Sequence, residues 1–342
     1  MLGCDTWRAA AVLSLMGCAM SVGPARAVRG ESQTMPKPAT GAEERIGRPV
    51  RVVSLSFHGK GLDQVCEVVN REGGKGADLI ALPEVWRGQN SPETLDGPTI
   101  KAIAALAARH HTYIVCPIDR KEGARRFNSA VLIDRRGQVV CVYDKVFPYW
   151  SEYDLKPPVD VGKEAPVHQA DFGRIGMAIC FDVNFPEVWK RLADQGAELV
   201  VWPSAYSAGT TLQAHALTNH FYIVTSTWKC DCIVYDITGE EIHYSKGQDI
   251  HVARITLDLD RGIYHQNFNI EKRDKLLKEH AREVIQDKWL DREQWFVLKA
   301  TRPGVSARGL ARQYGMEELR DYIDRSRRQI DQKRGWEFAT KR

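Results

Sequence analysis

The segment IGMAICFDVNFPE, residues 175–187, is an apolar run that ends on a cysteine and is followed by a proline. A continuous apolar run of this length is typical of a strand that is covered on both faces of its sheet. A proline is favoured where a helix begins. The segment therefore predicts a strand over Ile175–Phe181 and a helix beginning near Pro186, with Cys180 at the junction between them.

Strands and helices alternate on both sides of this segment. The pattern predicts strands over 51–57, 78–82, 113–117, 199–202, 222–227 and 252–259, helices over 62–73, 99–109 and 212–219, hairpins at 128–142 and around 238–239, and an irregular stretch over 145–166. The mixture of helices and hairpins is unlike a purely doubly wound sheet. It favours an α+β fold in which two mixed sheets pack face to face with helices outside.

The C-terminal part of the chain has a different composition. From residue 266 to residue 342 the sequence is strongly charged, and apolar residues recur at helical spacing over 275–285 and 317–330. We expect a charged helical extension that has no core of its own and packs on the domain or on a partner subunit.

The first 34 residues resemble an export leader. Arg8 precedes an apolar run over 9–20 that is too short to span a bilayer, and Ala25-Arg26-Ala27 has the form of a cleavage site. The residues LMGC also resemble a lipoprotein signal, which would place a lipid anchor on Cys18. We expect an exported protein, periplasmic or secreted. The alternative is a cytoplasmic enzyme that starts at Met35, which an acidic residue near the N-terminus favours.

Overall composition limits the classes of function. The 342 residues are 43% hydrophobic and 27% charged, with 48 basic and 44 acidic side chains, which is close to an average globular protein. The near-balanced charge gives no electrostatic reason to expect nucleic acid as a partner. The six cysteines after the leader have neither the density of a disulfide framework nor the spacing of a metal site. We expect a small-molecule substrate, no cofactor and no metal.

Three predicted strand ends each carry one reactive side chain. Glu84 follows the apolar run at 79–82, Lys145 follows the first hairpin, and Cys180 ends the strand at 175–181. A thiol beside a helix N-terminus and a lysine is expected to have a lowered pKa and to act as a nucleophile. A nearby carboxylate can accept the thiol proton, and an ammonium can stabilise an oxyanion. Together these residues indicate covalent attack on a carbonyl or nitrile carbon.

The sequences around these three residues resemble the signature blocks of the nitrilase superfamily, the carbon–nitrogen hydrolases. The matching blocks are Leu82-Pro83-Glu84, Tyr143-Asp144-Lys145 and 176–187, with further similarity at 127–130 (FNSA) and 201–204 (VWPS). The resemblance implies an α-β-β-α four-layer sandwich over residues 48–265. It also implies a homodimer or higher homo-oligomer.

The resemblance also implies roles for individual residues. Glu84 would be the general base, Lys145 the stabiliser of the tetrahedral intermediate and Cys180 the nucleophile that forms an acyl-enzyme. Glu152 matches a second glutamate that orients the lysine and the substrate, and the backbone N–H of Phe181 would complete the oxyanion hole. The chain departs from the family where many relatives carry Glu-Asn and this sequence has Thr218-Asn219.

The residues around the nucleophile also bear on the reaction. True nitrilases tend to carry Cys-Trp-Glu, whereas this chain has Cys180-Phe181-Asp182, which is similar to the amidase and carbamoylase branches. We therefore expect amide hydrolysis, with N-carbamoyl amide hydrolysis, nitrile hydrolysis or acyl transfer as alternatives. A further alternative is a non-catalytic scaffold, because a fold alone does not confer function.

Four aromatic residues are candidates for the substrate pocket. They are Tyr149, Trp150, Trp202 and Tyr206, which lie in segments expected to face the nucleophile. They would suit an apolar or aromatic acyl group. The alternative is that they serve only in packing or in a subunit interface.

Overall fold

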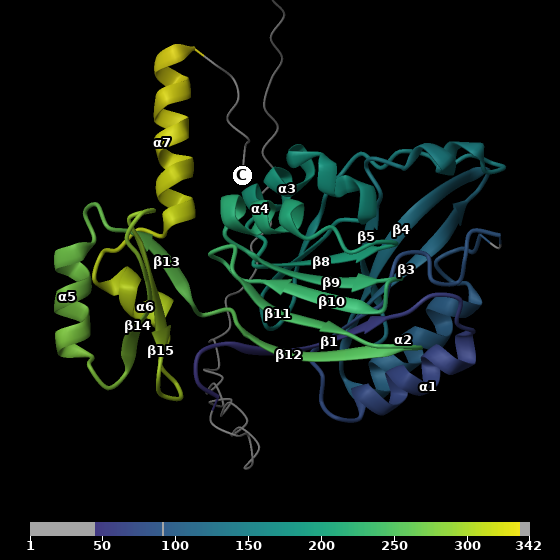
Figure 1. Ribbon diagram of the computed structural model, residues 1–342, viewed down its shortest axis with the longest axis horizontal. Helices are drawn as coiled ribbons and strands as arrows, with labels where there is room; N and C mark the ends of the chain where they lie inside the picture. The colour runs from purple at the N-terminus through teal and green to yellow at the C-terminus, as the bar shows by residue number, and fades with distance from the viewer. Residues whose placement is uncertain (1–44, 91, 336–342) are drawn as a thin grey trace, which may run out of the picture. The chain divides into compact units, whose positions relative to one another are not determined.

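The computed structural model describes residues 45–90 and 92–335, which belong to one compact unit. The expected leader lies outside the described residues. Figure 1 shows the arrangement of the elements. The strands are β1 (Pro49–Ser56), β2 (Leu79–Ala81), β3 (Tyr113–Glu122), β4 (Arg125–Ile133), β5 (Val139–Asp144), β6 (Val167–Gln169), β7 (Arg174–Met177), β8 (Leu199–Ser204), β9 (Tyr222–Thr227), β10 (Asp231–Tyr235), β11 (Glu241–Lys246), β12 (His251–Asp258), β13 (Gly262–His265), β14 (Val284–Leu290) and β15 (Trp295–Ala300). The helices are α1 (Leu62–Gly73), α2 (Pro98–His110), α3 (Pro186–Asp194), α4 (Thr210–Asn219), α5 (Ile270–Glu279), α6 (Ala307–Gln313) and α7 (Leu319–Arg334), with short 3-10 helices η1 (Trp150–Asp154) and η2 (Cys180–Asn184).

Two six-stranded mixed sheets form the centre of the protein. Their strand orders are β12-β1-β2-β3-β4-β5 and β11-β10-β9-β8-β7-β6. In each sheet three neighbouring strands are parallel, β1-β2-β3 in the first and β7-β8-β9 in the second, and the remaining pairs are antiparallel. The chain thus runs strand–helix–strand–helix–strand twice, a repetition of structure that is not visible as a repeat in the sequence.

The apolar runs of the sequence become strands that are buried on both faces. Within β1, Val52 belongs to the core between the two sheets, whereas Val53 belongs to the core under α1 and α2. Successive side chains of a strand point to opposite faces, so both faces of the strand must be apolar. On the second sheet, Trp189 of α3 and Ala216 of α4 join the core that the sheets share.

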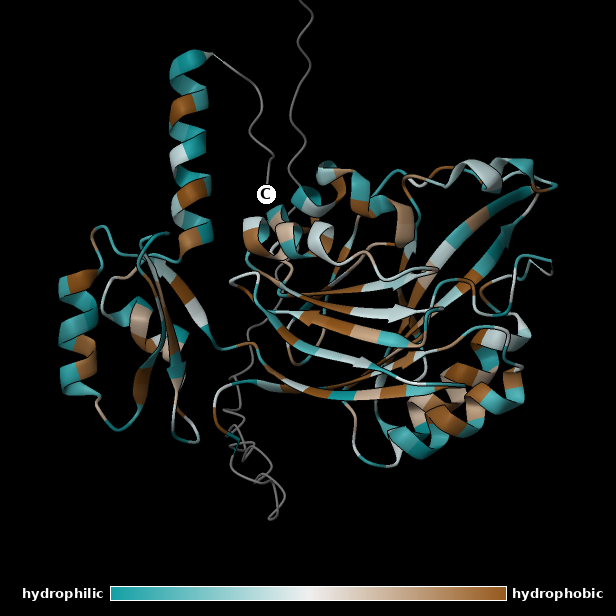
Figure 2. Ribbon diagram, viewed as in Figure 1, coloured by the Kyte–Doolittle hydropathy of each residue, from teal (hydrophilic) through white to brown (hydrophobic). Residues whose placement is uncertain are grey.

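These layers confirm the predicted α-β-β-α sandwich with helices outside. Hydrophobic residues line the strands of both large sheets in Figure 2. The expected strand at 175–181 is shorter than predicted, because β7 ends at Met177 and Cys180 begins η2. Among the described residues, no helix is both long and apolar enough to cross a membrane.

The C-terminal extension contains helices, as expected, but it also contains an unpredicted sheet. Strands β13, β15 and β14 form a three-stranded antiparallel sheet, and residues 262–335, which we call the C-terminal module, begin with β13. The module has a hydrophobic core that includes Tyr264, Leu276 and Phe296. The prediction that the extension forms no core of its own was therefore wrong.

Ion pairs explain why β14 was not recognised. This strand carries Asp287 and Lys288 side by side, which breaks its apolar pattern. Asp287 pairs with Arg261 at 2.7 Å, and Lys288 pairs with Asp236 at 2.7 Å. The charged residues of the strand are thus matched by partners distant in sequence.

Candidate active site

The three candidate catalytic residues follow three different strands. Glu84 comes after β2 and Lys145 directly after β5, both in the first sheet, whereas Cys180 follows β7 of the second sheet. Loops at strand ends commonly carry functional groups on a rigid scaffold. The packing of the two sheets brings the three residues together, although they are separated by up to 96 positions in the sequence.

A lysine and two glutamates form a buried cluster. The Lys145 Nζ atom lies 2.8 Å from Glu84 Oε1 and 2.7 Å from Glu152 Oε2. Lys145 is 1% exposed, and both glutamates are 4% exposed. Burial alone lowers the pKa of the Lys145 ammonium, but the charges of Glu84 and Glu152 outweigh it and raise that pKa. The lysine is therefore fixed as a cation.

Glu152 is held in place by a turn of its own segment. It lies in η1, and the backbone N–H of Tyr149 donates a hydrogen bond of 2.7 Å to Glu152 Oε2. The same oxygen accepts a hydrogen bond from Lys145. The expected irregular segment 145–166 is therefore ordered where it contacts the lysine.

Two amide side chains that were not recognised as site residues complete this cluster. Asn128 Nδ2 donates to Glu84 Oε1 at 2.8 Å and to Glu152 Oε1 at 2.7 Å, and Gln89 Nε2 donates to Glu152 Oε1 at 3.3 Å. Asn128 Oδ1 is buried and has no hydrogen-bond partner among the described residues. An orphaned acceptor at such a position is suited to an N–H group of a ligand. The FNSA block at 127–130 was the only available signal.

Cys180 has an unusual backbone conformation. Its φ angle is +44°, in the left-handed region that non-glycine residues rarely adopt. Its carbonyl oxygen accepts a hydrogen bond of 3.2 Å from Trp202 Nε1. Strain of this kind tends to persist where surrounding contacts hold a functional group in place.

The thiol of Cys180 does not have the lowered pKa that was expected. Burial and the charge of Glu84 raise the pKa to about 12, and the opposing effects of Lys145 and Ser204 are smaller. The expectation was wrong because it considered only the lysine charge and the helix terminus. The Lys145 charge also interacts with two carboxylates, so it does not offset the effect of burial on the thiol. The thiol is therefore protonated at neutral pH, and a base is needed to remove its proton.

Asp182 fixes the turn that follows Cys180. Its carboxylate accepts hydrogen bonds from the backbone N–H of Ile179 at 2.9 Å, the backbone N–H of Phe147 at 2.9 Å and the Tyr143 hydroxyl at 2.6 Å. Burial raises the pKa of Asp182 to about 6 despite these donors. Phe181 lies in the first turn of η2, where backbone N–H groups have no acceptor inside the helix.

The four aromatic candidates lie in different environments. Trp202 is fully buried, and its Nε1 atom donates a hydrogen bond to the Cys180 carbonyl. Tyr206 is more than one-third exposed and contacts the Trp202 ring. Partial burial raises the pKa of Tyr206, and the nearby Cys180 charge raises it further. The Tyr149 ring lies 5.2 Å from the Phe181 ring, and Trp150 is largely exposed. Tyr149 and Tyr206 therefore lie near Cys180 or the turn that follows it, whereas Trp202 is buried and Trp150 contacts the Tyr149 ring.

The arrangement can support acyl transfer. It contains a thiol, a carboxylate and a fixed cation, which are the groups that covalent catalysis at a carbonyl carbon requires. Within residues 45–90 and 92–335, no group of three or more His, Cys, Asp or Glu side chains is placed to hold a metal ion.

Comparison with known proteins identifies the class of this sandwich. The carbon–nitrogen hydrolase family matches residues 58–261. This match covers more than half of the chain, so the protein belongs to the carbon–nitrogen hydrolase family, within the nitrilase superfamily, and the predicted membership is confirmed. The match ends before β13, so the C-terminal module lies outside it.

Curated relatives include enzymes that act on amides. Deaminated glutathione amidase from Synechocystis is 31% identical over 191 residues, which cover 48% of this chain and 70% of that protein. A hydrolase of the pqqF 5′ region of Pseudomonas protegens is 32% identical, over 44% of this chain and 59% of that protein. Formamidase from Bacillus cereus is 29% identical, over 54% of this chain and 59% of that protein. The chain thus spans less than two-thirds of the length of two of these relatives.

Solved structures share the same fold. An amidase from a Nesterenkonia species has a TM-score of 0.55 at 20% identity, with 70% of this chain and 100% of that chain covered. Nit3 from Saccharomyces cerevisiae, of branch 10 of the nitrilase superfamily, has a TM-score of 0.54 at 17% identity, over 62% of this chain and 91% of that chain. At these identities the likeness establishes the fold.

Proposed function

We propose that this carbon–nitrogen hydrolase is an amidase that cleaves a carboxamide through a thioester on Cys180. The observation that carries the proposal is the Lys145 ammonium, which is buried between Glu84 and Glu152 at 2.8 and 2.7 Å. Burying charges in this way is costly and adds little stability by comparison with apolar packing. A fixed cation beside a thiol and a carboxylate has a clear use in acyl transfer.

The first half of the proposed reaction forms the thioester. Glu84 accepts the Cys180 thiol proton while Sγ attacks the carbonyl carbon, and the carbonyl π electrons move to oxygen. Lys145 and the Phe181 N–H stabilise the resulting oxyanion. When the carbonyl re-forms, the C–N bond breaks and Glu84 gives its proton to the departing nitrogen. Ammonia or an amine leaves, and the acyl group remains on sulfur.

The second half releases the acid. Glu84, again a carboxylate, removes a proton from water, and the hydroxide equivalent attacks the thioester carbon. The C–S bond then breaks, the thiolate recovers the proton from Glu84, and the carboxylic acid leaves. Because the raised pKa of Cys180, about 12, keeps the resting thiol protonated, Glu84 must act in both halves.

Glu152 and Asn128 are proposed as positioning residues. Lys145 donates hydrogen bonds to both Glu152 and Glu84. The Glu152 carboxylate therefore directs the ammonium and keeps it from moving toward Glu84 alone. Asn128 donates to both carboxylates, which holds them at a common distance from the lysine. The orphaned Asn128 Oδ1 is a suitable acceptor for the NH₂ group of an amide substrate.

The relatives support an amide as the substrate class. Two curated relatives are named as amidases of different substrates, deaminated glutathione and formamide. They differ in the acyl group and share the bond that is hydrolysed. The exposed aromatic residues Tyr149, Trp150 and Tyr206 favour an apolar or aromatic acyl group here.

The proposal is tested by measuring ammonia released from aliphatic and aromatic amides, N-carbamoyl amino acids and nitriles. Cys180→Ala is the inactive comparison, and Cys141→Ala, which removes a half-buried thiol from β5, is the matched control. We expect release from amides by the wild type and by Cys141→Ala but not by Cys180→Ala. Release only from N-carbamoyl compounds or only from nitriles would replace the proposal with the corresponding alternative, and a panel that releases neither ammonia nor, from N-substituted amides, an amine would contradict it.

A further inference from the structure

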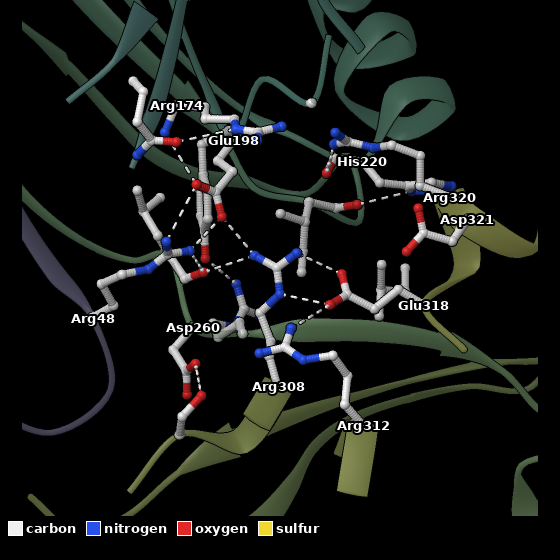
Figure 3. A pocket seen from close by; sticks show the side chains of 18 residues that line it. Arg48, Arg174, Glu198, His220, Asp260, Arg308, Arg312, Glu318, Arg320 and Asp321 are labelled. Atoms are coloured by element: carbon white, nitrogen blue, oxygen red, sulfur yellow. Dashed lines mark hydrogen bonds and ion pairs between the residues drawn. The ribbon is translucent and has the colours of Figure 1, made fainter. Parts of the chain in front are cut away.

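A second candidate site lies between the sandwich and the C-terminal module. A cavity of about 450 Å³ is lined by Arg48, Arg174 and Glu198 of the sandwich and by Arg308, Arg312 and Arg320 of the module, among others. Figure 3 shows these side chains converging from the two parts of the chain. The cavity is at the beginning of β7 and β8, whereas Cys180 follows the end of β7. It is therefore distinct from the catalytic cluster.

Part of the charge in this cavity is already paired. Arg308 makes a two-pronged ion pair with Glu318, at 2.8 and 2.6 Å, and donates to Glu198 Oε1 at 2.6 Å. Arg48 also pairs with Glu198. One carboxylate thus serves two guanidinium groups, and Figure 3 shows Arg308 between the two glutamates.

Two further guanidinium groups donate their hydrogen bonds to uncharged oxygens. Arg174 donates to the Gln169 side chain at 3.1 Å and to the Gln195 carbonyl at 3.3 Å. Arg320 donates to the carbonyls of Ala197 at 2.9 Å and His220 at 2.6 Å. These bonds orient both groups around the loop before β8 but do not neutralise them.

Gly196 allows the Arg174 guanidinium to lie close to the loop before β8. Gly196 has a φ angle of +80°, and a Cβ atom there would lie 2.4 Å from Arg174 Nη1. The loop thus has the backbone conformation and the space that the Arg174 guanidinium requires. Arg174 is exposed to solvent, and its guanidinium packs against this loop.

Positive charge exceeds negative charge in the lining. Six arginines and four acidic residues line the cavity, and one of the arginines, Arg261, pairs with Asp236 and Asp287, which lie outside the lining. Burial and the neighbouring Arg308 charge lower the pKa of Arg320 to about 10, although Glu318, Asp321 and Glu198 oppose this. Burial lowers the pKa of His220 to about 4, so this histidine is neutral near pH 7. A ligand that brings negative charge would relieve the remaining repulsion.

We propose that this cavity binds a small multivalent oxyanion, which joins the C-terminal module to the sandwich. Planar guanidinium groups match phosphoryl and carboxylate oxygens in a two-pronged geometry. The volume of about 450 Å³ is within the range of small-molecule sites, about 300–1,000 Å³. Arg312, whose side chain is 64% exposed and lies 3.9 Å from Glu318, is placed to contact the ligand at the mouth.

The experiment is isothermal titration calorimetry of the full chain with inorganic pyrophosphate and with citrate. Ionic strength is held constant, and sodium chloride is the blank. We expect saturable binding of one equivalent of at least one probe, and the tighter probe distinguishes a phosphoryl from a carboxylate ligand. Because the readout is binding and not turnover, failure here leaves the amidase proposal untouched. Heats that match the chloride blank for both probes would overturn the site.

Variants locate the binding. Arg320→Gln and Arg312→Gln should each weaken binding about tenfold, the loss expected for one charge-assisted contact. Arg325→Gln is the matched control, because Arg325 also lies on α7 but pairs with Glu317 outside this cavity. If Arg320→Gln fails to fold, Arg174→Gln takes its place. Unchanged affinity in the cavity variants, or an equal loss in Arg325→Gln, would overturn the proposal.

Discussion

Replacement of Glu152 by glutamine tests the buried cluster most sharply. Glu152→Gln keeps the shape of the side chain and removes one negative charge from the group formed with Glu84 and Lys145. In the wild type, Glu152 Oε2 accepts hydrogen bonds of 2.7 Å from both Lys145 Nζ and the Tyr149 N–H. The lysine would then be attracted to Glu84 alone and drawn away from the position shared by the two carboxylates.

The size of the effect follows from these contacts. A hydrogen bond to a charged group contributes about 1.5–3 kcal/mol. A buried charge left without any partner costs about 3–5 kcal/mol. The free-energy loss in Glu152→Gln is smaller, because Lys145 still pairs with Glu84 at 2.8 Å. Since about 1.36 kcal/mol corresponds to a tenfold change in rate, kcat/KM should fall about 10- to 100-fold.

The assay is steady-state hydrolysis of the best amide from the substrate panel, with thermal unfolding measured in parallel. Glu164→Gln is the matched control, because Glu164 is an exposed glutamate of the same 145–166 segment. We expect the control to retain wild-type kinetics. Wild-type kcat/KM in Glu152→Gln, or an equal loss in Glu164→Gln, would refute the role assigned to this carboxylate.

Four further results are expected. Lys145→Ala should abolish turnover and lower the stability by about 3–5 kcal/mol, because two buried carboxylates lose their cation; an unchanged melting temperature would contradict the cluster. Asn128→Leu should lower kcat/KM about tenfold or more through loss of both of its charge-assisted donations, measured by steady-state kinetics, and wild-type values would show that the amide group does not position the carboxylates. The alkylation rate of Cys180 by iodoacetamide, without substrate, should keep rising with pH, because the raised thiol pKa of about 12 leaves the thiolate scarce at neutral pH; a plateau near pH 7 would contradict this. We also propose that the protein is exported, so the intact mass of the native protein should correspond to an N-terminus at Val28 or at a lipid-bearing Cys18, whereas an N-terminus at Met35 would contradict export.

The sandwich, and the position of Glu84, Lys145 and Cys180 after the ends of three strands, were predictable because the relevant signals are local. Apolar runs such as 79–82 and 175–179 mark strands buried on both faces, and the residues that follow each run must lie at the carboxyl end of its strand. Glu84 and Cys180 were identified in this way. Their proximity across the two sheets was implied by the family resemblance, since no spacing in the sequence determines which strand ends meet.

Other features depend on contacts that a linear pattern does not contain. Asn128 reaches the two carboxylates because β4 pairs with β5 in a register that joins Ser129 to Asp144 and places the Lys145 N–H 2.8 Å from the Asn128 carbonyl. The upward shift of the Cys180 pKa results from burial and from a lysine charge that also interacts with two carboxylates, and neither can be read from the local sequence. The C-terminal sheet was missed because its charged strand residues are neutralised by partners distant in sequence.

The central claim is that Cys180 carries the acyl group during turnover. The most direct measurement is acid quenching of the enzyme during hydrolysis of its best amide, followed by peptide mass spectrometry. The account predicts that the acyl mass is found on the peptide that contains Cys180 and that Cys180→Ala neither turns over nor acquires it. An acyl group on another residue, or turnover by Cys180→Ala, would contradict the account.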